Sequence, residues 1–168
     1  GSLGTARPNR SDAVRLPITM LISLELYVMD ECAPLYLRFM AGVKLVKTWR
    51  CLRLDDLMAV GPQSFAERRD YWQITLERTK TTGPDKKRKK VHAYPYKNCH
   101  FVEPGWMKVF MGFVSGGALG YRRDYLIPLP TPGFNGVCAR LATTTDIIQI
   151  SRTLLETLRL PAFVTRAD

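Results

Sequence analysis

Apolar residues change their spacing along this chain, and that change restricts the fold more than any other feature. Up to about residue 60 they recur at intervals of three and four, as on one face of an α-helix. From Tyr71 the interval becomes two, because Trp72, Ile74 and Leu76 alternate with polar residues. Helical spacing returns after Pro104. The sequence therefore predicts an α+β fold, a mostly helical domain with a small antiparallel β-hairpin or sheet.

Proline and capping patterns place the ends of the helices. The predicted helices cover residues 17–32, 34–60, 104–115 and 143–160, and the second of them either continues or bends as it enters residues 52–60. A proline opens each of the first three, where its missing N–H costs nothing. Thr143 and Asp146 have the spacing of a capping box, so we expect the last helix to begin there. We expect Pro161 to end it.

The segment between these helices is predicted to form the hairpin. Its strands cover residues 71–77 and 88–94, and a cluster of Gly83, Pro84 and Asp85 supplies the turn. Farther along, residues 124–130 are expected to be extended and residues 131–136 to form a loop rich in proline and glycine. The turn and the second strand of the hairpin are strongly basic.

The charge balance points to a polyanionic partner. The 168 residues contain 25 Lys plus Arg against 15 Asp plus Glu, a formal net charge of +10. Such a surface attracts nucleic acid, and we expect duplex DNA bound mainly through its backbone. The most apolar stretch, Leu16 to Met29, contains Pro17 and Glu25 and is too short to span a bilayer. A membrane role is therefore not expected.

The chain is expected to be one domain preceded by an arm. Residues 1–11 are predicted to be a flexible polar arm, and residues 12–168 a single domain, since 46% hydrophobic residues suffice for one core. The first residues are Gly1 and Ser2 instead of Met, so we expect a fragment of a longer protein.

Neither a disulfide framework nor a metal site is expected. The four cysteines are scattered and form no C-x-x-C pair, which favours reduced, intracellular thiols. His92, Cys99 and His100 are candidate metal ligands, but their spacing fits no common pattern, and strand and loop positions explain them better. We expect no cofactor.

The first candidate site residues are Arg53 and Asp56. They lie three residues apart on a predicted helix whose Leu54 and Leu57 face inward. An acid at this spacing can pair with the guanidinium and fix its planar fork for a phosphate. An ordinary surface ion pair, worth little energetically, is the alternative interpretation.

The second candidate is Lys80, at the end of the first hairpin strand. A strand end holds a lysine more precisely than a free loop does. The residues expected to contact DNA beside it are Arg78, Thr79, Thr81, Lys86, Lys87, Arg88, Lys89 and Lys90. A solvated charge run is the alternative interpretation of residues 86–90. The same run is similar to a nuclear import signal, so we expect a nuclear protein if the source is eukaryotic and otherwise an intracellular one.

Together, Leu-Arg-x-x-Asp-Leu at residues 52–57 and Arg-Thr-Lys-Thr at residues 78–81 resemble motifs of the tyrosine recombinase (phage integrase) family. The resemblance covers about residues 17–160 and implies the N-terminal half of a catalytic domain. Residues 44–57, 80–87 and 123–130 look closest to the divergent recombinase-like proteins of eukaryotic mobile elements, particularly those of microalgae. The resemblance implies a role in DNA recombination and integration, with self-association on DNA.

The resemblance also implies a chemistry for the candidate residues. In this family a tyrosine hydroxyl attacks a DNA phosphodiester, without cofactor or metal, and forms a phosphotyrosyl link. Arg53 would neutralise charge on the nonbridging oxygens, with Asp56 supporting it, and Lys80 would protonate the leaving 5′-oxygen. Both are therefore candidate catalytic residues.

The sequence also departs from the family pattern. The family has an H-x-x-R box followed by a nucleophilic tyrosine, but neither His92 nor His100 has an arginine three residues on. Tyr121 and Tyr125 precede the place where the box should fall, and we expect them to pack or to contact phosphate. The chain by itself is therefore predicted to bind DNA without cutting it.

Two alternative functions use the same residues differently. In the first, the chain is a noncatalytic basic module that binds DNA or RNA, with the hairpin as an anchor and Arg53 in a structural role. Geometry separates it from the recombinase hypothesis, which requires Arg53 and Lys80 to converge on one phosphate. The second, a metal-dependent nuclease, is disfavoured because Asp55 and Asp56 are adjacent helix positions that do not face one site.

Overall fold

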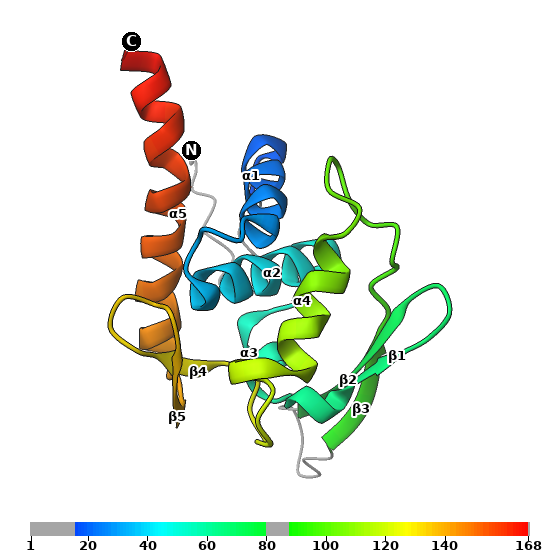
Figure 1. The fold of residues 1–168 in the computed structure, drawn as a ribbon. Coiled ribbons are helices and arrows are strands. Elements are labelled where there is room, and N and C mark those ends of the chain that lie inside the picture. Colours follow the sequence, from blue (N-terminus) through cyan, green and yellow to red (C-terminus); the bar gives the residue numbers. More distant parts are fainter. Residues whose placement is uncertain (1–15, 80–87, 168) are drawn as a thin grey trace, which may run out of the picture.

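The computed structural model describes residues 16–79 and 88–167 and has an α+β fold (Figure 1). The helices are α1 (Ile18–Met29), α2 (Leu35–Trp49), α3 (Leu54–Met58), α4 (Trp106–Ser115) and α5 (Thr144–Ala167), with short 3-10 turns η2 (Pro62–Ser64) and η3 (Gly117–Leu119). The strands are β1 (Phe65–Glu67), β2 (Trp72–Thr79), β3 (Arg88–Ala93), β4 (Pro128–Pro130) and β5 (Val137–Leu141). The predicted arm, residues 1–11, lies outside the described residues.

The core lies where α1, α2 and α4 meet. In Figure 1, α2 crosses the middle of the molecule, with the three-stranded sheet on one side and α5 on the other. The largest fully buried side chains are Trp106, Tyr36, Phe39, Phe110, Leu24, Met40, Leu45, Leu57, Ile74, Leu76, Met107 and Met111. They come from helices and strands alike, so one core joins both parts of the fold.

Two of the predicted helix starts are confirmed, and one predicted helix is divided. Pro17 and Pro34 are the N-cap residues of α1 and α2. The helix expected over 34–60 stops at Trp49, because Cys51 has φ 52, a left-handed conformation that cannot continue a right-handed helix. The Leu52 N–H then donates to the Lys47 carbonyl at 2.9 Å, and α3 begins separately.

The two predicted hairpin strands are confirmed, whereas the predicted turn residues Gly83, Pro84 and Asp85 lie outside the described residues. The sheet contains one more strand. β2 pairs antiparallel with β3, with Ile74 opposite Ala93, and β1 pairs with the other edge of β2. Ile74 and Leu76 are 0% and 1% exposed, as the two-residue period predicts. β1 was not predicted, because a strand of three residues is too short to show a period.

The end of the chain differs from the prediction in two ways. β4 falls within the stretch expected to be extended, but its partner β5 was not expected. α5 continues through Pro161 to Ala167, so the prediction that Pro161 ends this helix is wrong. A proline inside a helix removes one hydrogen bond and bends the helix, which does not always end it. Among the described helices, including the 24-residue α5, none combines the length and apolarity needed to cross a membrane.

Candidate nucleic-acid interface

Arg53 stands at the start of α3, not within a helix as predicted. It is the N-cap residue, with extended backbone at φ −84 and ψ 158, and its side chain is exposed. The inward-facing residue of this segment is Leu57, which is 1% exposed. Leu54 is partly buried against the same core. The buried leucines thus anchor α3 while Arg53 faces solvent.

Asp56 holds Arg53 through the backbone. Asp56 is 7% exposed, and its Oδ2 accepts a hydrogen bond of 2.9 Å from the Arg53 N–H. The three-residue spacing that predicted an ion pair within a helix therefore belongs to a helix start, where the acid binds a backbone N–H that has no intrahelical partner. Asp56 fixes the position of the Arg53 Cα, from which the guanidinium extends.

The β2–β3 pairing extends to the base of the basic turn. Arg78 lies opposite Lys89, and Thr79 lies opposite Arg88. Lys89 and Lys90 are exposed. Four of the predicted DNA contacts, Lys80, Thr81, Lys86 and Lys87, lie outside the described residues. The ladder therefore fixes the backbone immediately before Lys80.

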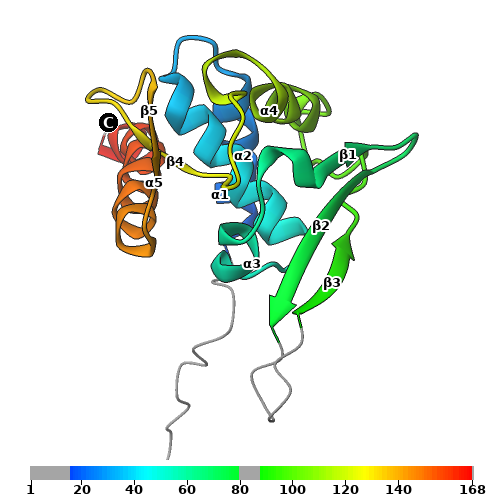
Figure 2. The same ribbon diagram turned by 90° about the horizontal axis from the view of Figure 1, so that it is seen from below.

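α3 and the hairpin share one end of the molecule. α3 packs against β2. Figure 2 shows α3 beside the end of β2 that leads into the turn. The side chain of Arg53 and the backbone that leads to Lys80 are thus on neighbouring elements. A phosphate site shared by Arg53 and Lys80 requires such neighbouring elements.

Three tyrosines gather at the opposite end of the same sheet. The Tyr71 ring lies 5.3 Å from that of Tyr94 and 5.7 Å from that of Tyr96, both edge to face. Next to Tyr94, the His92 Nδ1 lies 3.4 Å from the Thr75 hydroxyl. This group of tyrosines is not among the site residues predicted from the sequence. A pattern in the sequence could have revealed it. His92, Tyr94 and Tyr96 occupy alternate positions, which continue the outward face of β3.

Lysines on α2 form a further basic group that the sequence analysis did not single out. Lys44 and Lys47 are one turn apart and partly buried. Burial lowers the pKa of Lys44 to about 8, and the neighbouring Lys47 charge adds to this effect. Burial also lowers the pKa of Lys47. An anion bound at this face of α2 would raise both pKa values, since it stabilises the charged forms.

Arg123 is not available to a ligand. It is 7% exposed, and its guanidinium donates to the carbonyls of Leu119, Tyr121 and Leu126. The guanidinium lies 4.5 Å from the Tyr121 ring centre. The hydroxyls of Tyr121 and Tyr125 are 2.8 Å apart. The predicted packing role of the two tyrosines is therefore what their geometry supports.

The described residues contain no metal-binding cluster, and a groove in the structure lies away from the candidate residues. Across residues 16–79 and 88–167, no group of three or more His, Cys, Asp or Glu side chains could hold a metal ion. A groove of about 320 Å³ lies between β4, the loop before β5, and α5. Its acidic residue, Asp146, is already bonded to the N-cap of α5. None of the predicted site residues lines this groove.

Comparisons with models of protein families, with curated proteins and with solved structures give no match to this chain. The functional proposal therefore depends on the residues and their geometry alone.

Proposed function

We propose that this chain binds nucleic acid through phosphate groups, which Arg53 and the β2–β3 hairpin hold together. The observation that carries the proposal is the packing of α3 against β2, the strand that leads directly to Lys80. The net charge of +10 supports it, because such a surface concentrates polyanions. Exposed Lys89 and Lys90 extend the basic surface along β3.

The two cations would act differently on the bound backbone. Arg53 offers a planar fork that can donate two hydrogen bonds to one phosphate. Its main chain is held by Asp56, so less conformational freedom is lost on binding. Lys80 would supply a compact charge from the end of a paired strand. Residues 86–90 would follow the backbone without fixed geometry.

More specifically, we propose that this chain is a domain of the tyrosine recombinase type and comes from a mobile element. What supports this proposal is the pair of motifs around Arg53 and Lys80. Lys80 would then protonate the leaving oxygen, and Arg53 would stabilise the charge on the phosphate. Because the printed sequence has no H-x-x-R box, this chain should bind DNA without forming a covalent adduct. Nuclear location and self-association on DNA belong to the same proposal.

One observation favours the noncatalytic alternative, a basic DNA- or RNA-binding module. Asp56 binds the backbone of Arg53, which is an ordinary way to start a helix and needs no phosphate chemistry. Substituting Arg53→Lys separates the two functions. The substitution keeps the charge but removes the fork, so it should weaken binding if Arg53 grips a phosphate and leave binding unchanged if Arg53 is structural.

Single-charge variants test the proposed phosphate site at Arg53 and Lys80. Fluorescence anisotropy would measure the affinity for a labelled duplex with Arg53→Ala, Lys80→Ala and the control Arg152→Ala. Arg152 is exposed on α5, on the other side of the molecule (Figure 1). We expect the first two to weaken binding about three- to tenfold and the control to leave it nearly unchanged. Equal losses in all three variants would show that net charge alone attracts the duplex, and would contradict the proposed site.

A further inference from the structure

On the outward face of the β2–β3 ladder, the side chains change from aromatic at one end to charged at the end nearest the turn. Going toward the turn, the cross-strand pairs on this face are Tyr71 with Tyr96, Thr75 with His92, and Glu77 with Lys90, and between the first two pairs the Gln73 side chain contacts the His92 ring. All belong to one face, since the alternate positions Ile74 and Leu76 point into the core. We call the residues Tyr71, Gln73, Thr75, His92, Tyr94 and Tyr96 the tyrosine face.

The rings of the tyrosine face do not stack on one another. Tyr71 meets Tyr94 at an interplanar angle of 85° and Tyr96 at 67°. The His92 and Tyr94 ring centres are 6.1 Å apart and tilted by 40°. Tyr94 is 36% exposed and Tyr96 is 47% exposed. Tyr94 and Tyr96 therefore have accessible aromatic surface, on which another flat ring can stack.

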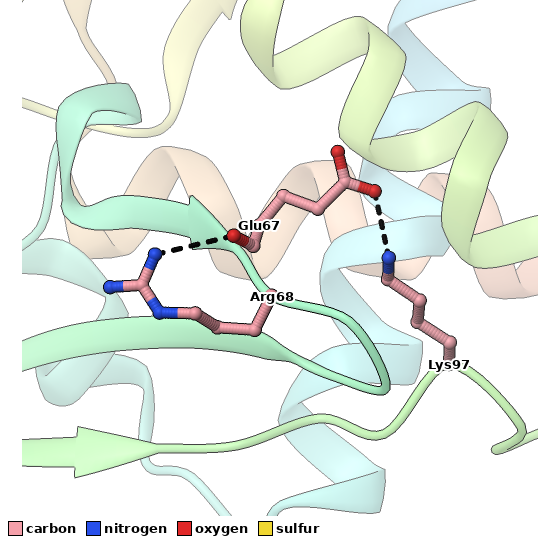
Figure 3. A network of polar contacts seen from close by, with 3 residues as sticks. All are labelled: Glu67, Arg68 and Lys97. Carbon is pink, nitrogen blue, oxygen red and sulfur yellow. Dashed lines mark hydrogen bonds and ion pairs between the residues drawn. The ribbon is translucent and has the colours of Figure 1, made fainter.

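Main-chain bonds hold this group in place. The Trp72 N–H donates to the Pro95 carbonyl at 2.9 Å, and the Lys97 N–H donates to the Asp70 carbonyl at 3.0 Å. Figure 3 shows the ion pair that closes the same corner, with the Lys97 Nζ 2.8 Å from the Glu67 Oε2. The backbone that carries Tyr71 and Tyr96 is thus fixed before any ligand binds, which lowers the cost of ordering the rings.

Positive charge borders the tyrosine face at both ends. Arg68 and Arg69 are exposed in the turn between β1 and β2, and Lys90, which shares the outward face with His92, is exposed on β3. A purely apolar partner would have to desolvate these cations without compensation. A nucleic-acid strand satisfies both chemistries, because its bases stack on aromatic rings and its phosphates pair with the flanking cations.

We infer that the tyrosine face is a binding platform for unpaired bases of a nucleic-acid strand. Tyr94 and Tyr96 stack against bases, His92 and Gln73 contact base edges, and the flanking Arg and Lys residues hold the phosphates. The ladder from Tyr71 to Glu77 is about 20 Å long, room for a short strand only. A closed duplex cannot use the platform because its bases are stacked inside. This inference deepens the proposed function, on which it depends only for the attraction of phosphate.

Matched oligonucleotides test the inference on the full chain. Anisotropy would compare a labelled oligothymidylate, an abasic strand with the same phosphates, and an oligouridylate. The protein variants are Tyr94→Leu with Tyr96→Leu, which removes the rings, and Tyr94→Phe with Tyr96→Phe, which keeps them. We expect the Leu pair to bind the thymidylate at least about tenfold more weakly, the Phe pair to bind like the parent, and neither pair to alter abasic binding. Thermal melting would confirm that every variant is folded.

Each outcome separates this inference from the proposed function. If the parent protein binds thymidylate and abasic strands equally, the tyrosine face holds no bases, while phosphate binding stands. If it binds neither strand, both proposals fail. If the Leu pair instead abolishes self-association in analytical ultracentrifugation and leaves strand affinity intact, a second copy covers the face and the inference is overturned. Preference between thymidylate and uridylate identifies DNA or RNA as the source of the bases.

Discussion

Buried carboxylates in this chain are bonded to backbone N–H groups. Glu25 is 0% exposed, and its two oxygens accept hydrogen bonds of 2.9 to 3.1 Å from the N–H groups of Phe101, Val102 and Glu103. Burying a charge without such partners would be costly. Glu25 therefore does not merely interrupt the apolar α1. It ties this helix to the loop before α4.

The candidate site illustrates what spacing alone can and cannot predict. Thr143 with Asp146 was recognised as a capping box because threonine is a favoured N-cap residue. Arg53 with Asp56 has the same spacing and the same bond, from the N-cap N–H to the acid. Arginine is not a typical N-cap residue, so the pattern was interpreted as an ion pair inside a helix. The sequence thus identified the residues but not the contact.

The Asp146 cap makes a prediction about stability at low pH. Hydrogen bonds from the Thr143 N–H and hydroxyl lower the pKa of Asp146 below its usual value. A group whose pKa is lower in the folded state adds stability above its unfolded pKa, about 3.9, and loses it as the pH falls through the folded value. We expect Asp146→Asn to lower the melting temperature at pH 7, and this deficit to shrink at pH values below about 4.

Melting curves of the parent and the variant between pH 2.5 and about 7 would measure that deficit. Asp124→Asn, at an exposed position outside any helix, controls for the loss of one negative charge. A deficit that is the same at every pH would show that the charge of Asp146 contributes nothing to the cap.

At the scale of the elements, the contact between α2 and α4 depends on one missing side chain. A Cβ at Gly42 would overlap the Phe110 ring, which is 1% exposed and stacks on Phe39 with ring centres 5.8 Å apart. Glycine inside a helix costs up to about 1 kcal/mol relative to alanine. The close approach of the two helices offsets that cost, since it buries a whole aromatic ring.

Substituting Gly42→Ala should therefore destabilise the protein, although alanine is the better helix former. Overpacking a core typically costs about 1 to 3 kcal/mol, which exceeds the gain in helix propensity. Gly112→Ala on α4 is the matched control, because no atom outside the neighbouring backbone of α4 lies within 4 Å of the added Cβ. We expect it to raise the free energy of unfolding by about 0.5 to 1 kcal/mol. Urea denaturation measures both values, and a stabilised Gly42→Ala variant would show that α4 can move away without loss.

Apart from the end of α5, the elements that were predicted correctly are those long enough to show a period. α1, the eight-residue β2 and α5 repeat their pattern several times. β1 has three residues and β5 five, and each is defined by its partner strand more than by its own sequence. The break between α2 and α3 depends on one left-handed residue, Cys51, whose type gives no sign of it.

At the scale of the whole molecule, we expect the position of each positive side chain to affect nucleic-acid binding more than the net charge does. Lys89 and Lys90 lie on β3, whereas the exposed arginines Arg140 and Arg152 lie on β5 and α5, on the other side of the molecule (Figure 1). Removing either pair lowers the net charge by the same amount. Only the first pair borders the surface that we propose to contact the phosphates.

The salt dependence of duplex binding distinguishes these two effects. Each phosphate that a protein neutralises contributes about −0.9 to the slope of log K against log salt concentration, because it releases condensed counterions. We expect Lys89→Gln with Lys90→Gln to make the slope less steep by about 1.8, and Arg140→Gln with Arg152→Gln to leave it nearly unchanged. Affinity measured by anisotropy over a series of salt concentrations gives both slopes. A parent affinity independent of salt would rule out backbone binding altogether, and identical slopes for the two double variants would mean that the duplex has no preferred side of this molecule.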